Sequence, residues 1–199
     1  MDSSQAKTRL MAECSRKEVS ALQARQWLLK HEIPESEIKQ IVNSLVKDKY
    51  IDDSRFAKAF TRDKLRFSKW GSDKIMTGLS DAGIDKAIAE QAIKEEETLS
   101  LQILSDLLSK KQKELERKQE KKIAETKSQI QLLYKKLNQL QNQKDSTPKD
   151  KVSIQRKIYA LQTKIRTSNQ QIRAALMAFA VRKGFSLAQI STVLKHIEK

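Results

Sequence analysis

Apolar and small residues recur every three or four positions along two stretches of the chain, 123–140 and 154–172. The first stretch places on one helical face Ile123, Thr126, Ile130, Leu133, Leu137 and Leu140. The second stretch places at the same spacing Ile154, Ile158, Leu161, Ile165, Ser168 and Ile172. An alternation of three and four is typical of a coiled-coil seam, so each stretch is predicted to be a helix with one apolar face.

The sequence NQKDSTPKD between these stretches predicts a turn, because Pro148 cannot continue a helix. If the chain folds back at Thr147, the two apolar faces meet. The facing pairs are then Leu140 with Ile154, Leu137 with Ile158, Leu133 with Leu161 and Ile130 with Ile165. This mirror symmetry predicts an antiparallel coiled-coil hairpin. The alternative is two separate surface helices.

Three further stretches share a second pattern, in which a helix is followed by a short break, a polar helix start and an apolar helix. Their breaks read HEI, AGI and KGF. Gly83 and Gly184 suit the left-handed conformation that follows a helix end, and Glu32 takes the matching position in the first stretch. Without the hairpin, the two intervals between these positions become similar, so the hairpin is predicted to be an insertion into the third repeat.

Leading helices are expected over 3–14, 52–67 and 98–115, the second of them capped by Asp52 and Asp53. The predicted fold is all-α, with three tandem three-helix repeats, similar to helix-turn-helix units, in an elongated, curved array. The expected boundaries are 1–51 for repeat one, 52–97 for repeat two, 98–117 with 171–199 for repeat three, and 118–170 for the inserted hairpin.

The charge of the chain is concentrated in the hairpin. The formal net charge is +15, yet residues 1–109 carry 18 Lys/Arg and 18 Asp/Glu, whereas residues 110–170 carry 17 and 6. Such an excess favours a polyanionic partner. A single cysteine, Cys14, excludes a disulfide within the chain, and no apolar leader or stretch of membrane-spanning length is visible. These features predict a cytoplasmic protein.

Catalytic motifs are absent from the sequence. There is no Gly-rich phosphate loop, no metal-ligand cluster and no nucleophile paired with a base, and neither His31 nor His196 lies in a known motif. The Asp52–Asp53 pair has no third ligand nearby, so helix capping is favoured over metal binding. We therefore predict a protein that is not an enzyme and has no cofactor.

Residues 52–71 crowd aromatic side chains among basic ones. Phe56 and Phe60 share a predicted core face, whereas a basic stripe on the same helix carries Arg55, Arg62 and Arg66. The stripe could be solvated or could bind phosphates or acidic protein groups. Phe67 and Trp70 could stack on bases, but a role in capping the core between helices is favoured.

The stretch IDDSRFAKAFTRDKLRFSKWGSDKIMTGLSDAGI (51–84) resembles the signature of the RecX family of regulatory proteins. Two weaker matches to that family are CSRKEVSALQARQWLLK near the N-terminus and AFAVRKGFSLAQISTVL near the C-terminus. The resemblance covers about 1–115 and 170–199, and the long hairpin departs from the simplest family pattern.

The resemblance implies three three-helix repeats and a regulator, active in DNA repair, that binds the RecA recombinase filament on single-stranded DNA. It implies modulation, with inhibition favoured, of RecA ATPase, strand exchange and homologous recombination. We expect a monomer with no membrane association. The candidate partner-binding or DNA-binding residues are Arg55, Arg62, Arg66, Lys69, Trp70, Lys74, Arg173, Arg182 and Lys183.

Two alternatives stay open. The chain could bind nucleic acid directly through the basic hairpin and its helical repeats, although no helix has the Asn, Gln and Arg spacing typical of base readout. It could also be a coiled-coil adaptor that dimerises through the hairpin, although the seam is satisfied within one chain.

Overall fold

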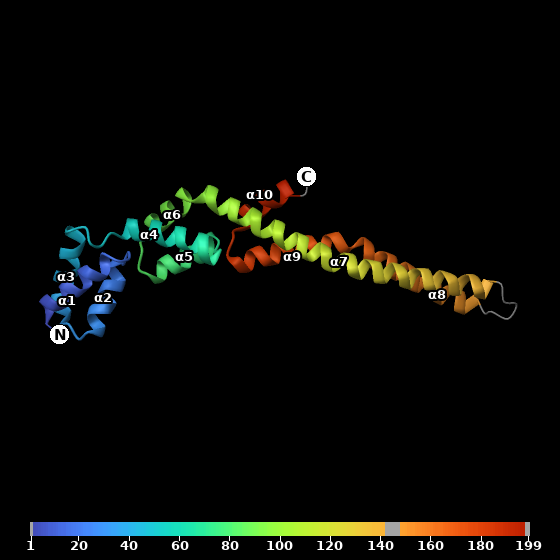
Figure 1. Cartoon of the computed structure of the whole chain (residues 1–199), viewed down its shortest axis with the longest axis horizontal. Coiled ribbons are helices and arrows are strands. Elements are labelled where there is room, and N and C mark those ends of the chain that lie inside the picture. The colour runs from blue at the N-terminus through green and yellow to red at the C-terminus, as the bar shows by residue number, and fades with distance from the viewer. Residues whose placement is uncertain (1, 142–147, 198–199) are drawn as a thin grey trace. The chain divides into compact units, whose positions relative to one another are not determined.

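The regular elements of the protein are helices, as the computed structural model shows for residues 2–141 and 148–197, where no strand occurs (Figure 1). They are α1 (Ser3–Cys14), α2 (Ala21–Lys30), α3 (Glu35–Lys47), α4 (Asp53–Asp63), the π-helical turn η1 (Lys64–Ser68), α5 (Ser72–Asp81), α6 (Lys86–Glu95), α7 (Glu97–Gln141), α8 (Pro148–Arg166), α9 (Ser168–Lys183) and α10 (Leu187–Ile197). The predicted all-α class is confirmed. The predicted fold-back point at Thr147 lies outside the described residues.

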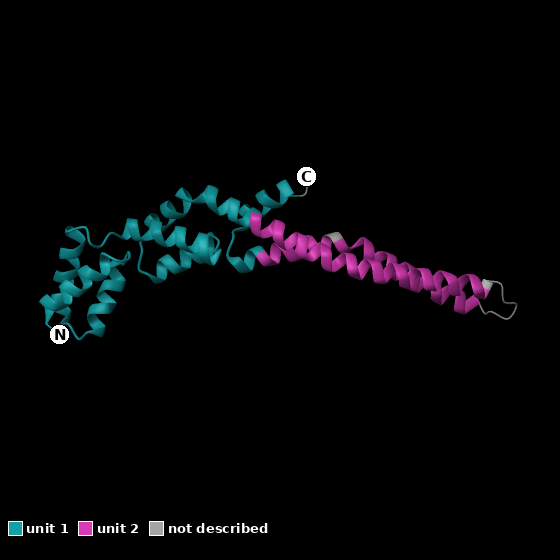
Figure 2. Ribbon diagram, viewed as in Figure 1, with its two compact units in different colours: residues 1–105, 180–199 teal, residues 106–179 magenta. Residues whose placement is uncertain are grey.

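The chain divides into two compact units (Figure 2). The first, which we call the repeat unit, comprises residues 1–105 and 180–199. The second, the hairpin unit, comprises residues 106–179. The insertion expected at 118–170 falls inside the hairpin unit, and the finer boundaries between the repeats stay predictions.

The three breaks recognised in the sequence have one backbone geometry. Glu32, Gly83 and Gly184 all have positive φ, at 60°, 77° and 84°. At each break the next residue donates its N–H to the carbonyl five positions earlier, as in Ile84 N to Leu79 O at 3.0 Å. These bonds close a Schellman-type helix end in each repeat, which confirms the predicted equivalence of the three positions.

Polar side chains fix the helix starts of the first two repeats. The Asp52 carboxylate caps α4 by accepting the N–H groups of Ser54 and Arg55, and the bond from Arg55 is the main cause that lowers the pKa of Asp52. Asp53 accepts the N–H of Ala21 at 3.0 Å. The predicted capping role is confirmed for Asp52, whereas Asp53 is the first residue of α4 and links that helix to α2.

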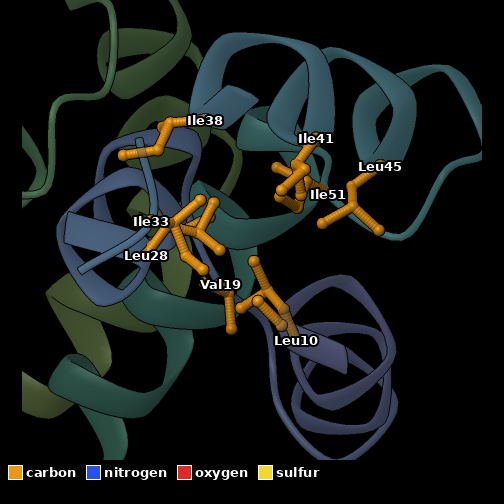
Figure 3. Close-up of a cluster of buried hydrophobic side chains, with 10 residues drawn as sticks. Leu10, Val19, Leu28, Ile33, Ile38, Ile41, Leu45 and Ile51 are labelled. Carbon is orange, nitrogen blue, oxygen red and sulfur yellow. The ribbon is translucent and has the colours of Figure 1, made fainter. Parts of the chain in front are cut away.

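The core of the first three helices is apolar and closely packed (Figure 3). Its buried residues come from all three helices and from the segments that connect them. They are Ala6, Leu10, Val19, Ala24, Leu28, Ile33, Ile38, Ile41, Leu45 and Ile51. Leu28 and Leu45 are 0% exposed. Burial on this scale offsets the ordering of the chain, since each buried leucine contributes roughly 2 kcal/mol.

The hairpin unit contains the predicted seam. Leu137 on α7 is buried against Ile154 and Ile158 on α8, and Ile130, Leu133 and Leu140 pack on the same cluster. A polar contact follows further along, where Gln119 donates to the carbonyl of Ser168 at 3.0 Å. The antiparallel coiled coil is therefore confirmed, with an additional polar contact where α8 gives way to α9.

Candidate interaction surface where α5 meets α9

Two segments distant in sequence meet backbone to backbone in the repeat unit. The N–H of Gly71 donates to the carbonyl of Lys183 at 2.8 Å, and the N–H of Asp73 donates to the carbonyl of Gly184 at 2.9 Å. A Cβ on Gly71 would lie 2.3 Å from backbone atoms of Gly184 and Phe185. Only glycine permits this approach, so the start of α5 and the end of α9 are held in a fixed relation.

This junction gathers cations from both segments. Lys69 has left-handed geometry, with φ 55°, directly before Trp70, and Lys74 lies in the first turn of α5 with its side chain against Gly184. Arg182 and Lys183 close α9. Among the described residues these four cations form no ion pair with Asp or Glu. The structure thus brings together five of the nine residues selected from sequence: Lys69, Trp70, Lys74, Arg182 and Lys183.

Trp70 is half-buried at the edge of this junction. The Lys64 ammonium lies 5.0 Å from the centre of the Trp70 ring and 5.1 Å from that of Phe60. A Cβ on Gly78 would contact both rings, so Gly78 provides the space for them. Trp70 therefore covers the end of the α4–α5 core. Lys64 was not selected from the sequence. Its spacing of four from Phe60 places both side chains on one helical face, so a contact between the ammonium and the ring could have been predicted.

Phe67 is 81% exposed, so the expectation that it caps the core is wrong. The reason is the π-helical turn at Lys64–Ser68. A π turn holds one residue more than an α turn, and it therefore rotates Phe67 away from the face that carries Phe60. No residue pattern in the sequence predicts such a turn, and π turns are frequent at functional sites.

The expected arginine stripe separates in the structure. The Arg55 guanidinium pairs with Glu18, Nε to Oε1 at 2.7 Å, and donates to the carbonyls of Lys49 and Tyr50 at 3.2 Å. Arg62 pairs with Glu96. Both arginines thus connect α4 to neighbouring segments. Arg66 is exposed, with no ion pair in the described chain. Arg173 belongs to the hairpin unit, where it is exposed on α9.

Two kinds of feature are missing from the part of the chain that the structure describes: metal-ligand clusters and membrane-spanning helices. No group of three or more His, Cys, Asp or Glu side chains within 2–141 and 148–197 is placed to hold a metal ion. Within the same ranges, no helix combines the length and apolar character needed to cross a membrane. The junction can attract anions, because its four cations are exposed or half-buried and form no ion pair with any residue that the structure describes.

Comparisons with known proteins agree with the sequence resemblance. A family model described as RecX, second three-helix domain, matches residues 52–93. The regulatory protein RecX of Oceanobacillus iheyensis is 30% identical over 109 residues, which cover 52% of this chain and 38% of that protein. A regulatory protein RecX of Lactobacillus delbrueckii subsp. bulgaricus is 34% identical over 67 residues, or 34% of this chain and 25% of that protein. The matches thus span well under half the length of these relatives.

Two solved structures share the fold. A crystal structure of RecX from Lactobacillus salivarius matches with a TM-score of 0.58 and 19% identity, covering 98% of this chain and 96% of that one. A crystal structure of regulatory protein RecX matches with a TM-score of 0.58 and 15% identity, covering 97% of this chain and 71% of that one. The shared fold therefore extends over the hairpin as well as the repeats. Sequence motif, family model and named relatives agree, so the predicted resemblance to the RecX family is confirmed, and the solved structures share its fold.

Proposed function

We propose that this chain binds the RecA filament on single-stranded DNA and inhibits its ATPase through the cations at the α5–α9 junction. The observation that carries the proposal is the RecX match over 52–93, which contains Arg66, Lys69 and Lys74. The matched relatives bear the name regulatory protein RecX. In this chain the match includes the cation-rich end of α4, η1 and the start of α5.

The rigidity of the junction supports this role. Its cations are carried by helix ends that are joined through backbone hydrogen bonds, so little backbone conformational entropy is lost when an anion binds. Acidic groups of adjacent filament subunits, or phosphates of the DNA, would supply the negative charge. A body inserted between subunits would hinder the subunit movements that accompany ATP hydrolysis.

The test is RecA ATPase on single-stranded DNA with the triple variant Lys74→Ala, Arg182→Ala and Lys183→Ala. We expect the concentration for half-inhibition to rise at least about tenfold, in line with the loss of several charge contacts. The matched control is the triple variant Lys30→Ala, Lys39→Ala and Lys47→Ala, which removes three exposed lysines of α2 and α3. Equal losses for both variants would contradict a specific role for the junction.

A second variant separates the two units. Residues 118–170 are replaced by a short link, and the ATPase assay is repeated. We expect inhibition to persist, because the junction lies in the repeat unit. Loss of inhibition would assign the activity to the hairpin, and absence of an effect from the full chain would contradict RecA regulation altogether.

Direct DNA binding is a second candidate, and Phe67 favours it. This ring is 81% exposed and follows Arg66 on η1, a combination suited to stacking on an unpaired base. Fluorescence anisotropy with oligothymidine and no RecA tests the idea. Phe67→Ala should weaken binding about tenfold, whereas the exposed Leu29→Ala on α2 serves as control.

A further inference from the structure

A shallow apolar groove runs between α7 and α8 in the hairpin unit. It has a volume of about 560 Å³ and is lined by Gln129, Leu132, Leu133, Lys136, Lys157, Ala160 and Leu161. Leu133 also packs in the seam, but Leu132 lies outside it and is 65% exposed. A two-helix coiled coil needs apolar residues only along its seam, so this groove is not required to hold the hairpin together.

The groove is surrounded by positive charge. Lys136 stands on its α7 side and Lys157 on its α8 side, and no Asp or Glu lines it. Over residues 126–166 the sequence has ten Lys/Arg and two Asp/Glu. An apolar strip between cationic rims is complementary to a ligand with an apolar face and acidic flanks.

We propose that this groove binds an acidic amphipathic helix of a partner protein. The helix would place its apolar face on Leu132, Ala160 and Leu161, and its carboxylates beside Lys136 and Lys157. A ridge of side chains on the incoming helix would fill the hollow between α7 and α8, as in other helix-in-groove complexes. The complex would be a three-helix bundle. This inference goes beyond the proposed function, because it needs neither the junction nor RecA.

Other occupants fit less well. A second copy of the hairpin carries the same excess of positive charge and would be repelled. Nucleic acid would use the lysines but gain little from a leucine-lined floor without an exposed aromatic ring. A membrane presents a broad surface rather than a ridge, whereas the hollow between two helices accepts a third helix.

The test uses the full chain and a fluorescein-labelled peptide of about 18 residues, with Leu at heptad positions a and d and Glu at most others. A twin peptide carries Lys in place of Glu. Fluorescence anisotropy should show binding of the acidic peptide and none of its twin. Equal binding of both peptides, or binding of neither, would overturn the proposal.

Matched variants locate the site. Leu132→Glu should weaken binding of the acidic peptide about tenfold. Tyr159→Glu makes the same charge change at a side chain that is 71% exposed and does not line the groove, so its effect should be small. Circular dichroism checks whether Leu132→Glu lowers the helix content. If it does, Ala160→Ser is used as the test substitution in the groove instead, and Ser153→Ala is its control.

Equal weakening by Leu132→Glu and Tyr159→Glu would mean that charge alone attracts the peptide, and the groove would be rejected. Anionic vesicles of phosphatidylserine and phosphatidylcholine, and oligothymidine, are measured alongside. If Leu132→Glu weakens binding of vesicles or oligothymidine more than binding of the peptide, the proposal of a helical partner is rejected in favour of a membrane or a nucleic acid.

Discussion

The repeat unit and the hairpin unit are both helical, but different interactions hold them together. In the repeat unit, short helices are joined by capped starts, left-handed breaks and backbone bonds between segments more than 100 residues apart, such as Gly71 with Lys183. In the hairpin unit, one seam with Leu137, Ile154 and Ile158 as its buried residues joins two long antiparallel arms. The first arrangement depends on many different local geometries, and the second on one repeated spacing.

The two units also differ in how many side chains they bury and in which groups they leave on the surface. The hairpin buries few side chains per turn and leaves cations and apolar residues such as Leu132 on its surface. The repeat unit buries leucines completely and places four cations that form no ion pair among the described residues at a junction fixed by glycines. We therefore expect mutations of the core to reduce stability more in the repeat unit than in the hairpin.

The largest effect is expected for Leu28→Ala in the first three-helix core. Leu28 is fully buried, and its removal leaves a cavity, so the free energy of unfolding of this region should fall by roughly 4 kcal/mol. Amide hydrogen exchange should accelerate in α2 and α3. The exposed Leu29→Ala is the control, and equal acceleration by both would refute the packing argument.

The second-largest loss of stability is expected for Gly71→Ala. Its Cβ would meet backbone atoms that cannot rotate away, so α5 and the end of α9 must separate at a cost of roughly 3 kcal/mol. Thermal unfolding and hydrogen exchange at Asp73 report the change. Stability equal to that of the unmodified protein would show that the close approach is not required.

Ile158→Ala tests the hairpin alone. This residue is buried in the seam, but a two-helix interface can relax around the gap, so we expect a local loss of roughly 2 kcal/mol. Hydrogen exchange should accelerate in α8 while that of α2 and α3 is unchanged. Equal acceleration in α2 would show that the two units unfold together.

Asp52→Ala removes a helix cap and should cost about 1 kcal/mol at pH 7. Folding lowers the pKa of Asp52, so its carboxylate stabilises the protein above the ordinary aspartate value of about 3.9, and this contribution is lost as the pH falls through the lower folded-state value. Denaturant unfolding from pH 7 downward should show the difference between the two proteins shrinking. If the difference in the free energy of unfolding did not change with pH, the charge of Asp52 would not be the cause of its stabilising effect.

The smallest effect is expected for Glu114→Gln in the hairpin unit. Hydrogen bonds from Lys118 and Lys111 lower the pKa of Glu114 to about 2. The group is exposed, so its contribution is small, is lost only at acid pH and is screened by salt. High salt should abolish the effect of this substitution on thermal unfolding while leaving that of Asp52→Ala largely intact. If the effect of Glu114→Gln did not depend on salt, the ion pairs of Glu114 could not be exposed to solvent.

Periodicity was sufficient to predict the hairpin, because a coiled coil repeats one contact that depends only on residue spacing. The pairing of Leu137 with Ile158 could be read from two patterns and one turn. The equivalence of Glu32, Gly83 and Gly184 was also predictable, since a left-handed residue after a helix is a local property.

The candidate site was predicted less completely. Sequence selected Arg55 and Arg62 for their charge, but their partners Glu18 and Glu96 lie 37 and 34 residues away and could not be assigned by helical spacing. Phe67 was expected to cap the core between helices, at the end of a helix predicted over 52–67. A single π turn reverses that assignment.

The sequence by itself determined the helices, the three equivalent breaks, the hairpin seam and the RecX resemblance, because each depends on residues close together in the chain or on one repeated spacing. Only the tertiary structure decided which cations remain without acidic partners, where Phe67 points and how Gly71 meets Gly184. These features depend on contacts between segments far apart in sequence, whose pairing is fixed by packing in three dimensions rather than by local pattern.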